Sequence, residues 1–340
     1  MSARRGASRG SGIVAVLGDG GWGTGLAVSA LRAGRSVRLW SAFPEYAAEL
    51  ARTRENRKFL PGVPIPAEIE ITADAAAALL GAELAVSAIP TQFVRGTVGR
   101  LAGSIPAGCL VVSASKGLER GTLLRASQVL AEVAPGRRVC VLSGPSHAEE
   151  VARGLPASVV AAAADAADAE RVQALLMGPA LRIYTSTDVA GVELGAALKN
   201  VIALAAGCAD GLGLGDNAKA ALITRGLVEL TRLGVELGAE AATFTGLSGL
   251  GDLVVTCTSL HSRNRRVGER LGRGEKLSDI LAGMQQVAEG VATAEAILQL
   301  AAKHGVELPI AGSVARVIAG ADPKAEVRAL MTRAPKAEDR

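Results

Sequence analysis

Aromatic side chains are scarce in this chain of 340 residues, where Phe, Trp and Tyr together make up 2%. Nucleic-acid-binding domains usually combine a basic stripe with aromatic side chains that stack on bases. Here the net charge is only +4, and the densest basic run is Arg263, Arg265 and Arg266. We therefore expect no nucleic-acid partner, and so compact a cluster better matches a small anionic substrate.

Cysteine is also scarce, and its spacing is not that of a disulfide framework or a metal site. No CxxC pair and no histidine at metal-ligand spacing accompanies the four cysteines, which are Cys109, Cys140, Cys208 and Cys257. Residues 1–11 are rich in Ser, Arg and Gly but lack the apolar stretch of a secretion signal. We therefore expect free buried thiols, no metal, a disordered N-terminus and a cytoplasmic location.

Long apolar runs without charge are missing as well. A membrane-spanning helix needs about 20 predominantly apolar residues, so we expect no membrane span. Apolar residues still make up 49% of the chain, which is enough for a sizeable core. A length of 340 residues predicts two domains.

The first half alternates short β-branched runs with helical stretches. Helices are expected over 24–32, closed by Gly34, and over 165–177. This alternation predicts an α/β fold with a doubly wound, mostly parallel sheet, whose ligands bind at the carboxyl ends of the strands. The expected strands are 13–17, 37–40, 84–89, 110–114, 139–142, 158–162 and 181–184.

Strand signals end near residue 189, and helical patterns follow. The helix expected over 217–237 has Asp216 or Asn217 as its N-cap and stops at Gly238. We predict a C-terminal all-α domain over 191–322 and a charged, disordered tail over 323–340. The expected helices are 189–208, 217–237, 263–272, 277–282, 293–304 and 313–319.

A glycine-rich turn follows the first strand and opens the first helix. Its sequence, Gly18-Asp19-Gly20-Gly21-Trp22-Gly23, fits the pattern GxGxxG. The first glycine permits the tight turn, the second lets backbone N–H groups approach a pyrophosphate, and the third allows close packing of helix on strand. The turn predicts a Rossmann-like dinucleotide-binding domain over 12–190; an ordinary glycine-rich turn is the alternative.

The residues that follow the second strand do not show whether the protein uses NAD or NADP. No carboxylate for a ribose 2′-hydroxyl and no arginine for a 2′-phosphate directly follows Trp40, and Glu45 lies further along. Asp19 would repel a pyrophosphate, so we expect its side chain to face outward.

Lys199 is the sole cation of the helix expected over 189–208. Its neighbours at helical spacing are small, so a ligand or another backbone can come close to it: Gly195, Ala196, Ala203 and Ala206. Such surroundings would desolvate the ammonium and lower its pKa toward a value useful for acid–base chemistry. A surface lysine beside a helix–helix contact is the equal alternative.

Several longer segments, in a fixed order over about residues 13–320, resemble the bacterial NAD(P)-dependent glycerol-3-phosphate dehydrogenase family. These segments are GDGGWGTGLA (18–27), NRKFLPG (56–62), SKGLE (115–119), SGPSHAEEVARGLPAS (143–158), ELGAALKNVIALAAGCADGLGLGDNAKAALITRGL (193–227) and GLSGLGDLVVTCTSLHSRNRRVG (246–268). The resemblance implies reversible hydride transfer between NAD(P)H and dihydroxyacetone phosphate to give sn-glycerol 3-phosphate, for glycerophospholipid synthesis, by a homodimer.

The same resemblance implies roles for individual residues. Lys199 would be the catalytic acid–base, Asn200 would anchor substrate, and Asp252 would hold substrate hydroxyls or orient Lys199. Lys116 would bind substrate and approach the cofactor. Ser262, Arg263 and Asn264 would hold the phosphate, with a solvated helix start as the alternative. The remaining ligand contacts would come from Gly144, Ser146 and Ala148, and the remaining cofactor contacts from Gly18, Gly20, Gly21, Trp22, Gly23, Ala42, Phe59, Arg263, Val287 and Glu289.

Three positions depart from the family pattern. His147 stands where the family usually has phenylalanine, Ala42 replaces a basic residue, and Gly21 replaces a serine. A related dehydrogenase of hydroxy or keto acids and a non-catalytic nucleotide sensor are the alternative functions. The intact Ser-Arg-Asn cluster at 262–264 argues against the first, and the presence of Lys199 and Asp252 argues against the second.

Overall fold

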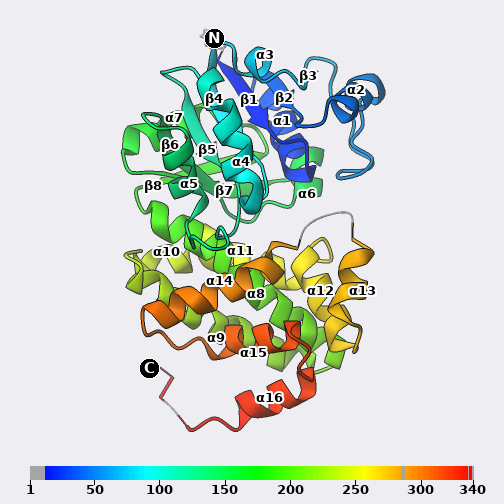
Figure 1. Cartoon of the computed structure of the whole chain (residues 1–340), viewed down its shortest axis with the longest axis vertical. Helices are drawn as coiled ribbons and strands as arrows, with labels where there is room; N and C mark the ends of the chain where they lie inside the picture. Colours follow the sequence, from blue (N-terminus) through cyan, green and yellow to red (C-terminus); the bar gives the residue numbers. More distant parts are fainter. Residues whose placement is uncertain (1–11, 285–287, 336, 339–340) are drawn as a thin grey trace, which may run out of the picture.

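The computed structural model describes residues 12–284, 288–335 and 337–338. The predicted disordered segment 1–11 and the predicted cofactor contact Val287 lie outside the described residues. Figure 1 shows one half of the molecule built around a sheet and the other half built of helices. The change falls between the last strand, which ends at Ser186, and a long helix that begins at Val189.

Eight strands form the sheet, in the order β3-β2-β1-β4-β5-β6-β7-β8. Neighbours pair in parallel except β6 and β7, which are antiparallel. The predicted α/β class with a doubly wound, mostly parallel sheet is therefore confirmed. The strands are β1 (Ile13–Leu17), β2 (Ser36–Trp40), β3 (Glu70–Thr72), β4 (Ala82–Ser87), β5 (Leu110–Ser113), β6 (Arg138–Ser143), β7 (Ala157–Ala163) and β8 (Leu181–Ser186).

Helices cover both faces of this sheet, which explains why its central strands are apolar on both sides. On β4, for example, Leu84 and Val86 belong to one buried cluster and Ala85 to another. The helices are α1 (Gly21–Arg32), α2 (Pro44–Thr53), α3 (Ala75–Leu79), α4 (Thr91–Leu101), the 3₁₀ turn η1 (Ala102–Ser104), α5 (Ala126–Val133), α6 (Ala148–Arg153) and α7 (Ala166–Leu176).

The second half consists of helices, and two details of the prediction were wrong there. Residues 323–331 are not a disordered tail but form α16, which Asp322 caps by accepting from the Lys324 N–H. The second helix begins at Gly215, so its predicted cap at 216 or 217 lies inside it. The elements are α8 (Val189–Leu212), α9 (Gly215–Glu236), α10 (Ala241–Thr245), the π-helical turn η2 (Leu247–Gly251), α11 (Asp252–Thr258), α12 (Arg263–Gly272), α13 (Leu277–Ala282), α14 (Glu289–Lys303), α15 (Pro309–Ile318) and α16 (Pro323–Met331).

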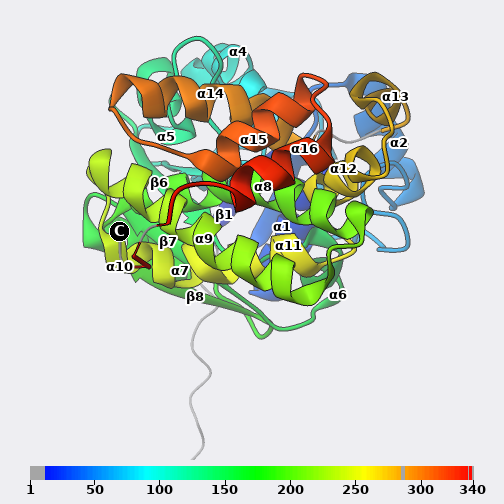
Figure 2. The same cartoon turned by 90° about the horizontal axis from the view of Figure 1, so that it is seen from below.

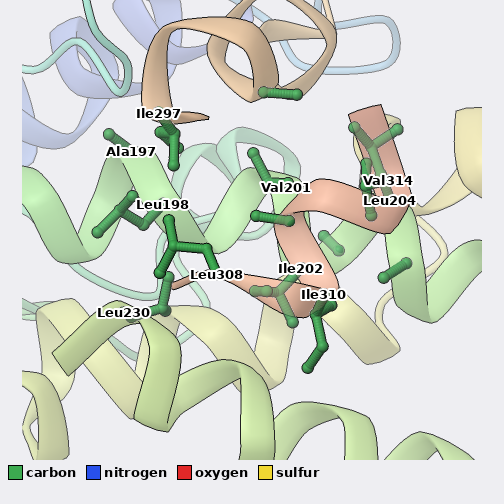
Figure 3. Close-up of a cluster of buried hydrophobic side chains, with 14 of the residues drawn as sticks. Ala197, Leu198, Val201, Ile202, Leu204, Leu230, Ile297, Leu308, Ile310 and Val314 are labelled. Carbon is green, nitrogen blue, oxygen red and sulfur yellow. The ribbon is translucent and has the colours of Figure 1, made fainter. Parts of the chain in front are cut away.

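Helix α8 is the centre of this half. Figure 2 shows α14, α15 and α16 on one side of it and α9 on the other. The helix is long and apolar enough to span a membrane, but 83% of its most apolar window is buried inside the protein. Figure 3 shows its side chains interleaved with those of α9, α14 and α15, among them Leu198, Ile202, Leu230, Ile297 and Ile310. The apolar composition of α8 therefore reflects its place in the core of a folded domain.

Candidate active site

Two lysines share one buried carboxylate where the two halves meet. The Nζ atom of Lys199, on α8, donates to Oδ1 of Asp252 at 2.5 Å. The Nζ atom of Lys116, which follows β5, donates to Oδ2 of the same carboxylate at 2.8 Å and to the Gly144 carbonyl at 3.0 Å. Because Lys116 lies at the carboxyl edge of the sheet, this group joins the expected ligand-binding edge to the first turn of α11.

Lys199 is not a surface lysine, since only 4% of it is exposed. Burial lowers its pKa from the ordinary value to about 8, although the Asp252 carboxylate opposes the shift. The pKa of Asp252 lies below its ordinary value, because the Lys116 and Lys199 ammonium groups outweigh the effect of burial. An amine with a pKa near neutrality can both give and take a proton at physiological pH.

The predicted face of small residues around Lys199 does admit another backbone. A Cβ atom on Gly195 would lie 2.8 Å from the Ser248 carbonyl oxygen, so η2 approaches α8 more closely than a side chain would allow. Sequence reasoning missed Thr256, whose hydroxyl accepts from Lys199 Nζ at 2.6 Å. The sequence did contain a signal for Thr256. It follows Asp252 by one helical turn and therefore lies on the same face of α11.

Asn200 and Asn264 lie together and connect four elements. The Asn264 amide donates to the Asn200 side-chain oxygen at 3.0 Å, and the Gly290 N–H donates to the Asn264 oxygen at 3.0 Å. The Asn200 amide makes a long contact of 3.4 Å with the Lys116 carbonyl. These bonds hold the buried Asn264 side chain against α8 and α14, whereas Arg263 beside it is exposed.

All three residues predicted to hold the phosphate, Ser262, Arg263 and Asn264, lie at the start of α12. Ser262 is the N-cap, and its hydroxyl accepts from the Arg265 N–H at 3.2 Å. Backbone N–H groups and the dipole at a helix N-terminus favour an anion. Arg265 itself is buried and paired with Asp210, whereas Arg263, the first residue of α12, is exposed.

Glu289 lies at the contact between the two halves. Its carboxylate accepts from the Thr91 N–H at the start of α4, at 3.2 Å. Burial raises its pKa, and the positive charges of Arg263, Lys116 and Lys199 oppose that rise. Glu289 is therefore close to the site in space, although it is distant from the glycine turn along the chain.

The glycine turn has the geometry that a dinucleotide needs. Gly18 has φ +114°, and a Cβ atom on Gly23 would lie 1.9 Å from the Gly18 carbonyl oxygen. A Cβ atom on Gly21 would lie 2.6 Å from the Phe59 carbonyl oxygen, whereas one on Gly20 would meet nothing within 4 Å. Gly20 is the N-cap of α1, which has no side-chain cap. The first and third glycines are thus needed for packing, and the α1 N-terminus is open to an anion.

Asp19 does not face outward, so that prediction was wrong. Only 9% of it is exposed, and its carboxylate accepts from the Ser41 hydroxyl at the end of β2. The amide of Asn56, a fully buried residue that sequence reasoning missed, donates to the Asp19 carbonyl and the Thr24 hydroxyl, each at 2.7 Å. Asp19 is therefore turned into the protein, where burial raises its pKa, while Ala42 is exposed just after β2.

The other predicted ligand contacts lie around this turn or near Lys116. The Nε1 atom of Trp22 is buried and has no hydrogen-bond partner among the described residues. The Phe59 ring lies edge-on to Tyr46, with centroids 6.0 Å apart. Ser146 donates to the Gly144 carbonyl at 2.9 Å, and Ala148 begins α6. Within the described residues, no group of three or more His, Cys, Asp or Glu could hold a metal ion.

Two family models match the chain. One describes the N-terminus of NAD-dependent glycerol-3-phosphate dehydrogenase and matches residues 13–169. The other describes the C-terminus of the same enzyme and matches residues 188–328. The second match begins at residue 188, next to the start of α8, where the sheet gives way to helices.

Individual relatives are similar over nearly the whole chain. A protein of Moorella thermoacetica named glycerol-3-phosphate dehydrogenase [NAD(P)+] is 52% identical, over 94% of this chain and 96% of its own. The crystal structure of glycerol-3-phosphate dehydrogenase from Coxiella burnetii superposes with a TM-score of 0.91 at 37% identity, covering 95% of this chain and 99% of its own. The yeast enzyme gives a TM-score of 0.80 at 26% identity, covering 95% and 99%. The chain therefore belongs to the NAD-dependent glycerol-3-phosphate dehydrogenase family.

Proposed function

We propose that this protein interconverts dihydroxyacetone phosphate and sn-glycerol 3-phosphate with NAD or NADP, as the names of its relatives indicate, and that it supplies glycerophospholipid synthesis. The observation that carries the proposal is the buried Lys199 amine with a pKa of about 8, held by Asp252 beside Lys116. A carbonyl that accepts a hydride also needs one proton at its oxygen, and this amine can supply it.

Lys199 moves the proton in this mechanism. In reduction its ammonium donates to the C2 oxygen of dihydroxyacetone phosphate, and in oxidation the neutral amine takes the proton back from the hydroxyl. Asp252 keeps the amine pointed at the substrate and balances its charge. Lys116 binds substrate oxygens from the sheet side, Asn200 anchors them, and Gly144 and Ser146 line that loop.

The phosphate of the substrate would bind at the start of α12. Ser262 and Arg263 face it there, with the helix N-terminus behind them, while Asn264 acts by fixing Asn200. Deletion of the Arg263 guanidinium would remove a charged donor from this end of the substrate and leave the Lys199 amine in place.

The dinucleotide, which when bound would supply or accept the hydride, would bind across the glycine turn. Gly20 and the open N-terminus of α1 would hold its pyrophosphate, with Gly18, Gly21 and Gly23 shaping the turn. Trp22, Phe59 and Ala148 border that turn, and Ala42 lies at the end of β2, where the adenosine ribose would lie. On the substrate side, Lys116, Arg263 and Glu289 would reach the nicotinamide end.

We further propose a division into a dinucleotide-binding domain over 12–190 and a substrate-binding domain over 191–322, and a cytoplasmic homodimer. Support for a reducing compartment comes from the four free cysteines. Support for a dimer comes from large apolar side chains that the helical half exposes, among them Leu214, Val235, Val254, Leu260 and Met331.

The activity assay mixes the purified protein with dihydroxyacetone phosphate and either NADH or NADPH and follows the loss of reduced-nicotinamide absorbance. Lys199→Met should lower kcat by at least about a thousandfold, because the proton donor is lost, while NADH fluorescence titration gives an unchanged Kd. Lys303→Met, which changes an exposed lysine at the end of α14, is the matched control. A native protein that consumed neither cofactor would contradict the proposed function.

A further inference from the structure

His147 presents a buried nitrogen that nothing in the described protein satisfies. It is the residue before α6, in the loop that follows β6. Its Nε2 atom is buried and has no hydrogen-bond partner among the described residues. Because a buried polar atom without a partner costs free energy, such an atom often marks the place of a ligand.

The surroundings of His147 place it at the phosphate end of the proposed site. Its ring faces the ring of His261 across the junction of the two halves, with centroids 5.8 Å apart. His261 directly precedes Ser262, the N-cap of α12. His147 therefore lies opposite the helix start that would hold the substrate phosphate, on the side that belongs to the dinucleotide-binding half.

The charges around this imidazole come from several elements. Lys199 on α8 and Lys116 after β5 act on it from the substrate side, and Glu149 and Glu150 act from α6. The pKa of His147 is lowered by burial first and then by the two lysines, and the glutamates only partly offset this. His261 faces it, and Arg263, two residues after His261, begins α12. The ring is therefore harder to protonate than an ordinary imidazole, and in its neutral form it keeps one N–H donor.

We propose that His147 is a substrate-binding residue that donates a hydrogen bond to the phosphate of the bound triose phosphate, from the side opposite Ser262 and Arg263. This inference rests on the proposed function. A phosphate carries between one and two negative charges near neutral pH, so its arrival offsets the positive field of the two lysines. The imidazole then gains a proton and binds the phosphate by a stronger, charge-assisted bond.

Proton uptake by His147 can be observed directly, because the chain has only three histidines. Nitrogen NMR of the imidazole groups would give the pKa of each histidine with and without sn-glycerol 3-phosphate, and the signal missing from His147→Phe assigns His147. We expect the pKa of His147 to rise when sn-glycerol 3-phosphate is added, while the nitrogen signals of His304 stay unchanged. An unchanged pKa for His147 in the saturated protein would overturn the proposal.

Kinetics provide the second readout. His147→Phe should raise KM for dihydroxyacetone phosphate by about tenfold or more and leave kcat and the KM for NADH within about twofold. His147→Gln, which keeps a neutral donor, should recover most of the loss, and His304→Phe is the matched control. With dihydroxyacetone, which has no phosphate, native protein and His147→Phe should have equal kcat/KM.

The outcomes separate the two proposals. If the native protein reduces dihydroxyacetone phosphate and His147→Phe has an unchanged KM, the role of His147 is wrong and the proposed function stands. If His147→Phe impairs dihydroxyacetone as strongly as dihydroxyacetone phosphate, the residue acts on the fold of the site and not on the phosphate. If the native protein turns over neither substrate, the proposed function itself fails.

Discussion

At the scale of single residues, the placement of Asp252 decides the charge of the site. One carboxylate that is 1% exposed contacts the ammonium groups of Lys116 and Lys199. Without it, the two ammonium groups would repel each other in a buried space. Burial would then favour the neutral amine of Lys199. In the proposed mechanism, Asp252 would therefore hold on Lys199 the proton that reduction of the carbonyl requires.

Asp252→Asn tests this at the residue scale. Loss of the negative charge should lower the pKa of Lys199 below its value of about 8, since the main force that opposes desolvation is removed. In the proposed mechanism, carbonyl reduction needs the protonated amine, so activity should be present below that pKa and lost above it. The basic limb of the kcat profile should therefore move to lower pH. Asp216→Asn, an exposed change at the start of α9, should leave the profile in place, and an unmoved limb in Asp252→Asn would contradict this role.

At the scale of elements, α8 and α12 approach each other through glycine. A Cβ atom on Gly207 would lie 2.0 Å from the Arg265 carbonyl oxygen, and one on Gly268 would lie 2.0 Å from the Leu204 carbonyl oxygen. Contacts this short involve backbone atoms that cannot rotate away. The two helices therefore carry Lys199 and the start of α12 at a fixed spacing, which would set the distance between the proposed proton donor and the proposed phosphate site.

Gly207→Ala tests the contact at this scale. Overpacking against backbone should lower the free energy of unfolding by about 3 kcal/mol, despite the better helix propensity of alanine. Gly96→Ala is the matched control, because Gly96 also lies inside a helix but a Cβ atom there meets nothing within 4 Å. That control should gain about 0.5–1 kcal/mol. Urea unfolding curves of both variants give the comparison, and equal effects in the two would contradict close helix packing.

At the scale of the whole molecule, the site exists only where the two halves meet. Apart from the pairing of Lys116 with Asp252, the carboxylate of Glu193 on α8 accepts from the Ser127 N–H at 2.8 Å and from Arg125 at 2.7 Å, both at the start of α5. Glu289 makes a similar contact with α4. These buried cross-contacts fix the orientation of the sheet edge over the helical half.

The oligomeric state is the prediction at this scale. A homodimer would cover apolar side chains that the helical half leaves exposed, and burial of that surface would offset the loss of rotational freedom on association. Light scattering after size-exclusion chromatography should give twice the chain mass of 34.4 kDa. A mass that stays at that of one chain at micromolar concentration would contradict the dimer.

Much of the fold could be predicted because its signals are local. Seven of the eight strands, the glycine turn and α8 each follow from periodicity, β-branching or helix stops within a few residues, whereas the three-residue strand β3 was not predicted. The short helices α2, α4 and α6 escaped prediction, because a few turns of helix bury too few side chains to show a clear period. Helix α16 was hidden by its charge, although Asp322 followed by Pro323 is a strong helix start.

The sequence by itself determined the alternation of strands and helices in the first half, the change to helices near residue 189, the position of the glycine turn and the small-residue face of α8, since each depends on neighbouring residues. Only the tertiary structure decided that Lys199 is buried against Asp252, 53 positions away, that Lys116 reaches the same carboxylate from 136 positions away, and that Asp19 turns inward to Ser41. The physical reason is that desolvation and charge pairing depend on which atoms meet after the chain has folded, and spacing along the sequence does not record those meetings.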